Sequence, residues 1–196
     1  MSDFELIRRR LDEQLAPPHN LTIETARIRQ AAVTLLLREA QSEAELLIIK
    51  RAEREGDPWS GHLALPGGRA EPQDENLLAT AARETHEEIG VDLHNGGMFI
   101  GQLPLIAPRN PRLPQIEITP LVAIAPPKHE FQFSDEVVSA FWVSVGRLKG
   151  EGRSGEHRWQ FGGTTQKWPA SPTEPGLIWG IPERILTNFL ELLDRQ

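Results

Sequence analysis

The chain has 196 residues, and its 21 lysines and arginines against 28 aspartates and glutamates give a formal net charge of −7. This balance argues against a protein that holds nucleic acid or an anionic membrane by a broad basic face. The absence of cysteine excludes disulfides, thiolate metal sites and cysteine nucleophiles. The amino-terminal stretch mixes charged and apolar residues without the apolar core of a signal peptide, so we expect a cytoplasmic location.

The first half of the chain predicts a helix followed by a hairpin. Ser2 and Glu5 fit a capping box, and apolar residues follow them at helical spacing. Two leucine-rich and β-branched runs, at 31–39 and 44–52, are separated by a polar turn and predict paired strands. A loop dense in glycine and proline follows at 56–68.

The second half alternates in the same way. A helix is expected from about 75 to 89, where Gly90 ends it. Three strand-like runs, an irregular segment and a closing amphipathic helix follow, at 98–108, 116–127, 137–145, 146–176 and 181–196. Strands interleaved with three helices predict a single α/β domain over 1–196 with a mixed sheet, in which 1–30 form the first helix and a lead-in.

Three glutamates of the helix at 75–89 predict a metal site. Glu84, Glu87 and Glu88 fall within an arc of roughly 100°, beside the apolar arc that would pack on a sheet. Like charges at these spacings repel, by roughly a few tenths of a kcal/mol per pair. Mg²⁺ or Mn²⁺ would relieve the repulsion, because these ions prefer oxygen ligands and often take substrate phosphates as further ligands. Arg83 is placed to orient one of the glutamates from behind.

The same segment resembles the Nudix box, the metal-binding loop and helix of the Nudix hydrolases. The resemblance rests on "LPGG" at 65–68, an acid at Asp74 and "RETHEEIGV" at 83–91. It implies a Nudix-type α/β/α sandwich that hydrolyses a nucleoside diphosphate linked to another moiety, with the three glutamates holding the metal. The expected partner is a small nucleotide diphosphate, with no nucleic acid and no membrane, and a homodimer is left open.

The spacing inside this box leaves two readings of its acid. Counting forward from Gly68 gives Asp74, whereas counting back from Arg83 gives Glu75. We favour Asp74, because the longer gap with an aspartate resembles the coenzyme A pyrophosphatase branch. The upstream signature of that branch is matched in part, by Arg51 with Ala52 and by Gly61 with the Pro-Gly-Gly turn.

This resemblance implies cleavage of coenzyme A or acyl-coenzyme A to 3′,5′-ADP and (acyl-)4′-phosphopantetheine. Hydrolysis of ADP-ribose or a nucleoside diphosphate sugar is the alternative within the class. A non-hydrolytic nucleotide-binding module is the alternative outside it, although such a module would be expected to have lost a metal glutamate.

The expected site residues fall into two groups. The catalytic group is Arg83, Glu84, Glu87, Glu88 and Asp74, and the substrate-binding group is Arg51, Gly67, Gly68, Arg109 and Arg112. The general base stays open among Glu87, Glu130 and Glu136, and His86 is expected to be a spacer that points away from the metal. The segment 146–176 has five cations and three acids, a net charge of 5 − 3 = +2, and either closes over an anionic ligand or is a solvated loop anchored by its tryptophans.

Overall fold

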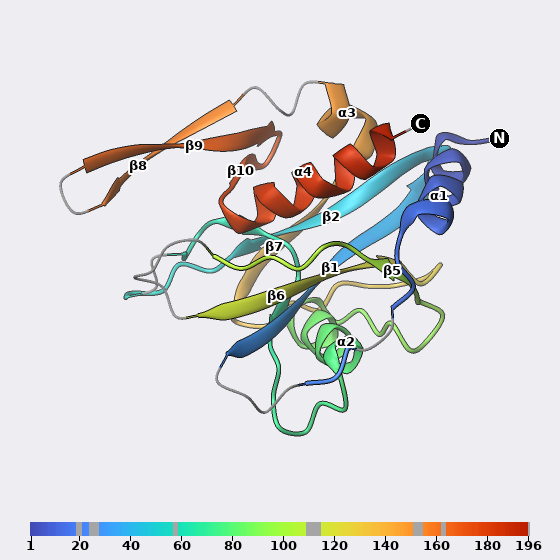
Figure 1. Ribbon diagram of the computed structural model, residues 1–196, viewed down its shortest axis with the longest axis horizontal. Coiled ribbons are helices and arrows are strands. Elements are labelled where there is room, and N and C mark those ends of the chain that lie inside the picture. Colours follow the sequence, from blue (N-terminus) through green and yellow to red (C-terminus); the bar gives the residue numbers. More distant parts are fainter. Residues whose placement is uncertain are drawn as a thin grey trace.

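The computed structural model describes residues 1–18, 21–23, 28–56, 59–108, 115–150, 155–161 and 164–195. In this part of the chain, a mixed β-sheet lies between helices on its two faces (Figure 1). Helix α2 (Leu77–Ile89) covers one face, and helices α1 (Asp3–Gln14) and α4 (Ile181–Asp194) cover the other. This arrangement confirms the expected α/β/α sandwich.

The centre of the sheet is strand β1 (Arg29–Ala40). It pairs antiparallel with β2 (Glu43–Arg51), which confirms the predicted hairpin, and parallel with β6 (Ile116–Ile124). The short strand β4 (Gly67–Arg69) also pairs with β1, so the Gly-Gly turn is attached to the middle of the sheet.

Three further strands extend the sheet on either side. Strand β5 (Met98–Gln102) pairs with β6, whereas β3 (Leu63–Ala64) and β7 (Val137–Ser144) both pair with β2. The main order is therefore β3-β2-β1-β6-β5, with parallel and antiparallel neighbours in one sheet.

The two faces of the sheet belong to separate hydrophobic clusters. Leu35 and Leu37 of β1 pack into the cluster that contains Leu11 of α1 and Phe189 of α4. Leu36, between them, packs with the α2 side of the sheet. This alternation follows from the two-residue period of a strand, which points successive side chains to opposite faces.

The helix ends follow their local signals. The capping box of α1 is complete, because the Ser2 hydroxyl accepts from the Glu5 amide at 3.1 Å and the Glu5 carboxylate accepts from the Ser2 amide at 2.7 Å. Helix α2 begins two residues later than expected, because the side chain of Asn76 accepts from the Ala79 amide and acts as the N-cap. No helix in the described part of the chain is long and apolar enough to cross a bilayer.

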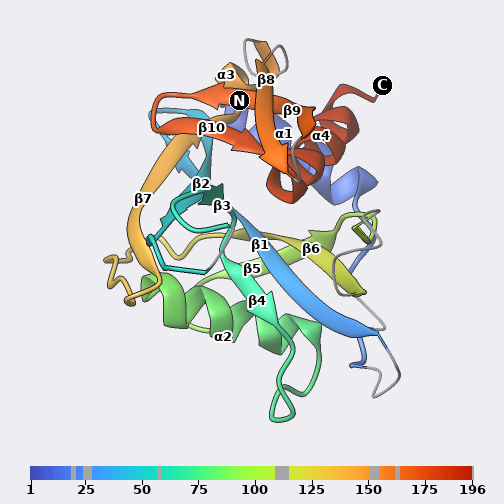
Figure 2. The same cartoon turned by 90° about the vertical axis from the view of Figure 1, so that its left-hand side faces the viewer.

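The expectation of an irregular segment at 146–176 is wrong. After a short helix α3 (Val145–Gly150), the chain forms strands β8 (Gly155–Phe161) and β9 (Thr164–Thr173). Together with β10 (Gly176–Trp179) they make a second, antiparallel sheet with the order β10-β9-β8, which lies on the α4 side of the molecule (Figure 2). The glycines and prolines of this segment lower its local β-propensity, so the sequence did not predict strands there. In the structure, pairing between neighbouring strands overrides this weak propensity.

Candidate active site

Helix α2 is held in place at both ends. Asn76 caps its first turn, and Gly90 ends it in the left-handed conformation with φ of 75°. A side chain at position 90 would also collide with Gln132, whose Cβ would lie 2.8 Å away. The glutamates of α2 therefore project from a fixed scaffold, as a metal site requires.

Arg83 is the centre of a charged network on this helix. Its guanidinium donates two bonds to Asp74, from Nε to Oδ1 at 2.9 Å and from Nη2 to Oδ2 at 3.0 Å. Its Nη1 donates to Glu84 Oε1 at 3.0 Å and to Glu87 Oε2 at 2.9 Å. Arg83 is therefore the cationic partner of these glutamates, and it contacts two of them, where the sequence predicted that it would orient one.

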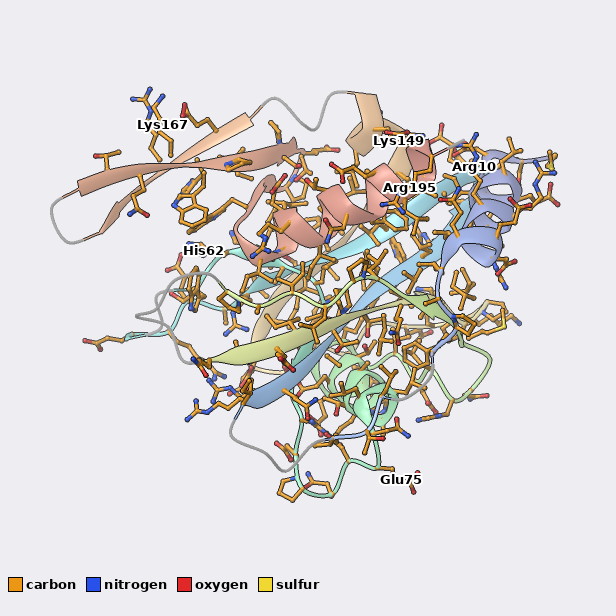
Figure 3. All side chains as sticks on the ribbon, viewed as in Figure 1. Arg10, His62, Glu75, Lys149, Lys167 and Arg195 are labelled. Carbon is orange, nitrogen blue, oxygen red and sulfur yellow. The ribbon has the colours of Figure 1, made fainter. Side chains whose placement is uncertain are left out.

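Only one of the two candidate box acids is a partner of Arg83 among the contacts of the described residues. Asp74, not Glu75, forms the bidentate pair with Arg83, and Asp74 also accepts from the Thr80 hydroxyl at 2.9 Å. The hydrogen bonds from Arg83 lower the pKa of Asp74 to about 2, so its carboxylate stays ionised at neutral pH. Glu75 is exposed and lies at the outer edge of the molecule (Figure 3).

Glu88 is a buried carboxylate. Only 5% of the residue is exposed, and its Oε2 accepts a hydrogen bond from the Gly67 amide at 2.9 Å. Burial raises the pKa of Glu88 to about 8, although the bond from Gly67 acts in the opposite direction. Gly67 has φ of 147° and lies against the backbone of β1, so only glycine brings its amide this close to the helix. A buried carboxylate that is costly to ionise has much to gain from a nearby positive charge.

Glu84 lies beside Glu88, over the second glycine of the turn. A side chain at Gly68 would overlap the carboxylate of Glu84, which explains a glycine there on packing grounds. Burial raises the pKa of Glu84, and the cation of Arg83 partly offsets this effect. The Gly-Gly turn thus positions both carboxylates, while substrate contact by either glycine stays a prediction.

The donor set fits a hard divalent cation. Glu84 and Glu88 supply carboxylate oxygens next to a backbone turn, and oxygen ligands are what Mg²⁺ and Mn²⁺ prefer. Glu87 is more remote, because 56% of its side chain is exposed and it is bonded to Arg83. Within the described ranges, no three acidic or histidine side chains converge tightly enough to hold an ion, so binding by all three glutamates would require them to move together.

Two residues from outside the box act on the same carboxylate. The charge of Arg51 lowers the pKa of Glu88 and the charge of Glu136 raises it, which places both near the buried acid. Glu136 is held by Arg54, whose Nη1 lies 3.1 Å from Glu136 Oε1. Of the three candidate bases, Glu87 and Glu136 therefore belong to this region, whereas no contact among the described residues places Glu130 there. Sequence reasoning missed Arg54, because its salt bridge joins two loops.

Of the remaining expected residues, His86, Arg109 and Arg112, the structure describes only His86. His86 is exposed on α2, as expected for a spacer. Arg109 and Arg112 lie outside the described residues.

A cavity of about 260 Å³ opens beside this cluster, and sequence reasoning missed it. Arg51 lines it together with Trp59, His62, Leu63 and Trp179. Arg51 therefore belongs both to the cavity and to the surroundings of Glu88. The available signal in the sequence was Trp59 and His62, in the loop that leads to the Gly-Gly turn.

The fold and site define a class of α/β/α proteins in which a glycine turn supports a glutamate-bearing helix. A model of the NUDIX domain matches residues 28–161, and the chain belongs to the Nudix family. Nudix hydrolase NudL of Yersinia pestis, an uncharacterized protein, is 31% identical over 137 residues, which cover 68% of this chain and 65% of that protein. The uncharacterized protein C14C4.10c of Schizosaccharomyces pombe is 39% identical over 108 residues, which cover 53% of this chain and 32% of that protein.

A solved structure of a MutT/nudix family protein from Enterococcus faecalis shares the fold, with a TM-score of 0.55 and 19% identity over 88% of this chain and 65% of that one. The chain thus spans about a third to two thirds of the length of the curated relatives named above.

Proposed function

We propose that the protein is a pyrophosphohydrolase that cleaves the diphosphate linkage of a nucleoside diphosphate derivative with Mg²⁺ or Mn²⁺. The observation that carries this proposal is the buried Glu88 beside Glu84, with Glu88 bonded to the Gly67 amide and Glu84 packed against Gly68. Membership of the Nudix family supports the same reaction class. A non-hydrolytic module is disfavoured, because the chain retains every glutamate of the box.

A cation bound by Glu84 and Glu88, with Glu87 moving closer, would neutralise phosphate oxygens and lower the pKa of an attacking water. Arg83 and Asp74 hold the carboxylates in position. Arg51 is placed to bind the diphosphate charge, since it lies between the cavity and Glu88. Glu136 is half-exposed near Glu88, so it joins Glu87 as a candidate to accept the proton of the water.

Metal removal tests the reaction class. We expect EDTA to abolish cleavage of nucleoside diphosphate derivatives, and Mg²⁺ or Mn²⁺ to restore it. Ca²⁺ should bind and inhibit, because it tolerates looser geometry than the reaction needs. The measurement is product formation across a panel of coenzyme A, ADP-ribose and a nucleotide sugar. Full activity in EDTA, or nucleotide binding without cleavage under any metal, would contradict the proposal.

Coenzyme A or acyl-coenzyme A is the substrate we propose within this class, with 3′,5′-ADP and (acyl-)4′-phosphopantetheine as products. The upstream residues that resemble the coenzyme A branch come together in the structure. The Arg51 amide donates to His62 O at 3.0 Å, and the Gly61 amide donates to Ala52 O at 3.3 Å. Gly61 has φ of 71°, which favours glycine at that position. These two backbone hydrogen bonds hold Arg51 at the cavity, where its guanidinium can bind a phosphate of the substrate.

The 3′-phosphate of coenzyme A makes this choice testable. Loss of one charge-assisted phosphate contact costs roughly 1.5 to 3 kcal/mol, so dephospho-coenzyme A should show a kcat/KM about ten- to a hundredfold lower. The measurement is kcat/KM for coenzyme A, its dephospho form, ADP-ribose and a nucleotide sugar. If ADP-ribose or the sugar were preferred by about tenfold or more, the alternative substrate would replace coenzyme A and the reaction class would stand.

A further inference from the structure

The cavity beside Arg51 has aromatic walls from separate parts of the chain. Trp59 and His62 come from the loop before the Gly-Gly turn, and Trp179 ends strand β10 of the second sheet. The ring centroids of Trp59 and Trp179 lie 6.0 Å apart at an angle of 44°, so the two rings are not stacked on each other. Figure 3 shows His62 in the region between the second sheet and the central sheet.

The second sheet holds this wall in place. His157 of β8 stacks on Trp179 with a centroid distance of 4.1 Å and an angle of 22°. His62 approaches the same indole edge-on at 4.9 Å. Both contacts fix the plane of Trp179, so this indole, of which 7% of the residue is exposed, keeps one orientation where it lines the cavity.

The size and position of the cavity indicate which part of a ligand it takes. At about 260 Å³ it lies below the usual range of whole-ligand pockets, which begins at roughly 300 Å³. Its lining is mainly apolar and aromatic, and its one cation, among the lining residues described, is Arg51, on the side of Glu88. A planar ring in the cavity would therefore extend a phosphate past Arg51 toward helix α2.

We propose that this aromatic cavity is a nucleobase subsite, in which Trp59 and Trp179 contact the base while Arg51 binds the phosphate that follows it. The inference rests on the proposed function, because it identifies where the nucleoside end of the diphosphate is held. A purine can stack on the partly exposed indole of Trp59 beside the fixed ring of Trp179, and stacking on aromatic side chains is a general way to bind a base. A flexible pantetheine chain would gain no comparable advantage from the fixed orientation of Trp179.

The test is ligand binding to the full chain in EDTA, followed by tryptophan fluorescence, with adenosine 5′-phosphate, ribose 5-phosphate and 4′-phosphopantetheine as probes. All three carry a phosphate that Arg51 can bind, so their differences isolate the base. Adenosine 5′-phosphate should bind roughly tenfold to a hundredfold more tightly than ribose 5-phosphate. Trp59→Leu should remove this advantage, and Trp59→Phe should restore most of it. Trp142→Phe is the matched control, since Trp142 packs with Arg38 in a different cluster.

Equal binding of adenosine 5′-phosphate and ribose 5-phosphate, preference for 4′-phosphopantetheine, or an unchanged Trp59→Leu protein would each overturn the subsite. The binding measurement needs no turnover, so it is independent of the reaction. If the base preference holds but no diphosphate is cleaved with metal, the proposed function fails alone. If cleavage occurs and Trp59→Leu leaves KM for base-bearing substrates unchanged, the subsite fails alone.

Discussion

Helices α2 and α4 cover opposite faces of the same sheet, and each buries one glutamate (Figure 1). Glu183 of α4 is 7% exposed and accepts a bond at 2.8 Å from Thr187, one turn further along its own helix. Glu88 of α2 is 5% exposed, but its partner is the Gly67 amide of another element. Burial alone therefore does not distinguish the two glutamates, whereas the element that supplies the hydrogen-bond partner does.

The two helices also differ in the charge around the buried acid. Glu88 follows Glu84 by one turn, and Arg83 links that turn to Asp74 and Glu87. No other acid lies within four residues of Glu183 in the sequence. Helix α2 thus concentrates negative charge where a cation is useful, whereas α4 closes the hydrophobic core.

The largest expected effect is the loss of activity when the buried acid of α2 is changed. Glu88→Gln keeps the shape of the side chain but removes its charge, so kcat/KM should fall by at least about a hundredfold. Loss of a residue that only orients a metal ligand typically costs about ten- to a hundredfold. Its free energy of unfolding without metal should not fall, because the substitution removes a carboxylate that is costly to ionise. Glu183→Gln is the matched control and should retain activity. A folded Glu88→Gln protein with near-normal turnover would remove Glu88 from the site.

The second effect is on the pH dependence of stability in EDTA. Because the folded pKa of Glu88, about 8, lies above its ordinary value of 4.5, the folded state retains a proton that the unfolded state has lost between these pH values. Stability should therefore fall as pH rises from about 4.5 to about 8, by up to about 1.4 kcal/mol per pH unit. Asp74 has the opposite shift, and its contribution is lost only as pH falls from 3.8 toward 2.

Thermal unfolding between pH 5 and pH 8 measures this effect, since each kcal/mol corresponds to about 2 to 4 °C in a chain of this size. Mg²⁺ should raise Tm more at pH 8 than at pH 5, because it binds the ionised carboxylates. Glu88→Gln should flatten the metal-free profile. A wild-type profile as flat as that of Glu88→Gln would show that Glu88 is not the titrating group.

The smallest expected effect comes from the residue that orients Arg83. Asp74→Asn weakens the bidentate pair, so affinity for Mg²⁺ or kcat should fall by about ten- to a hundredfold. Glu75→Gln, one position further along, should have no comparable effect. Mg²⁺ titrations of activity distinguish the two, and equal losses in both variants would restore the alternative reading of the box acid.

The sequence predicted the elements whose signals are local. The capping residues of α1, the leucine-rich and β-branched run of β1 and Gly90 at the end of α2 each act within a few residues, and the corresponding elements are found as expected. The strands at 155–173 were missed, because their pairing partners, not their composition, make them strands.

The candidate site divides in the same way. The spacing from Arg83 to Glu88 placed the glutamates on one helix, which needs only the helical period. The bonds that Arg83 forms with Asp74, the amide of Gly67 under Glu88, and the cavity at Trp179 all join distant segments. No local pattern encodes such contacts, so they became visible only in the folded chain.

The position of β1 in the sheet has a consequence for the order of folding. Its hairpin with β2 involves neighbouring residues, but its other edge pairs with β6, where Arg29 lies opposite Ile116. Closing the long loop between β1 and β6 costs chain entropy before any contact between the two strands stabilises it, so this pairing forms slowly. An early hairpin therefore presents an open strand edge and the apolar side chains of Leu35 and Leu37 until β6 arrives. Before β6 pairs with β1, this open edge and these apolar side chains can contact a second chain, so self-association is most favoured in that interval.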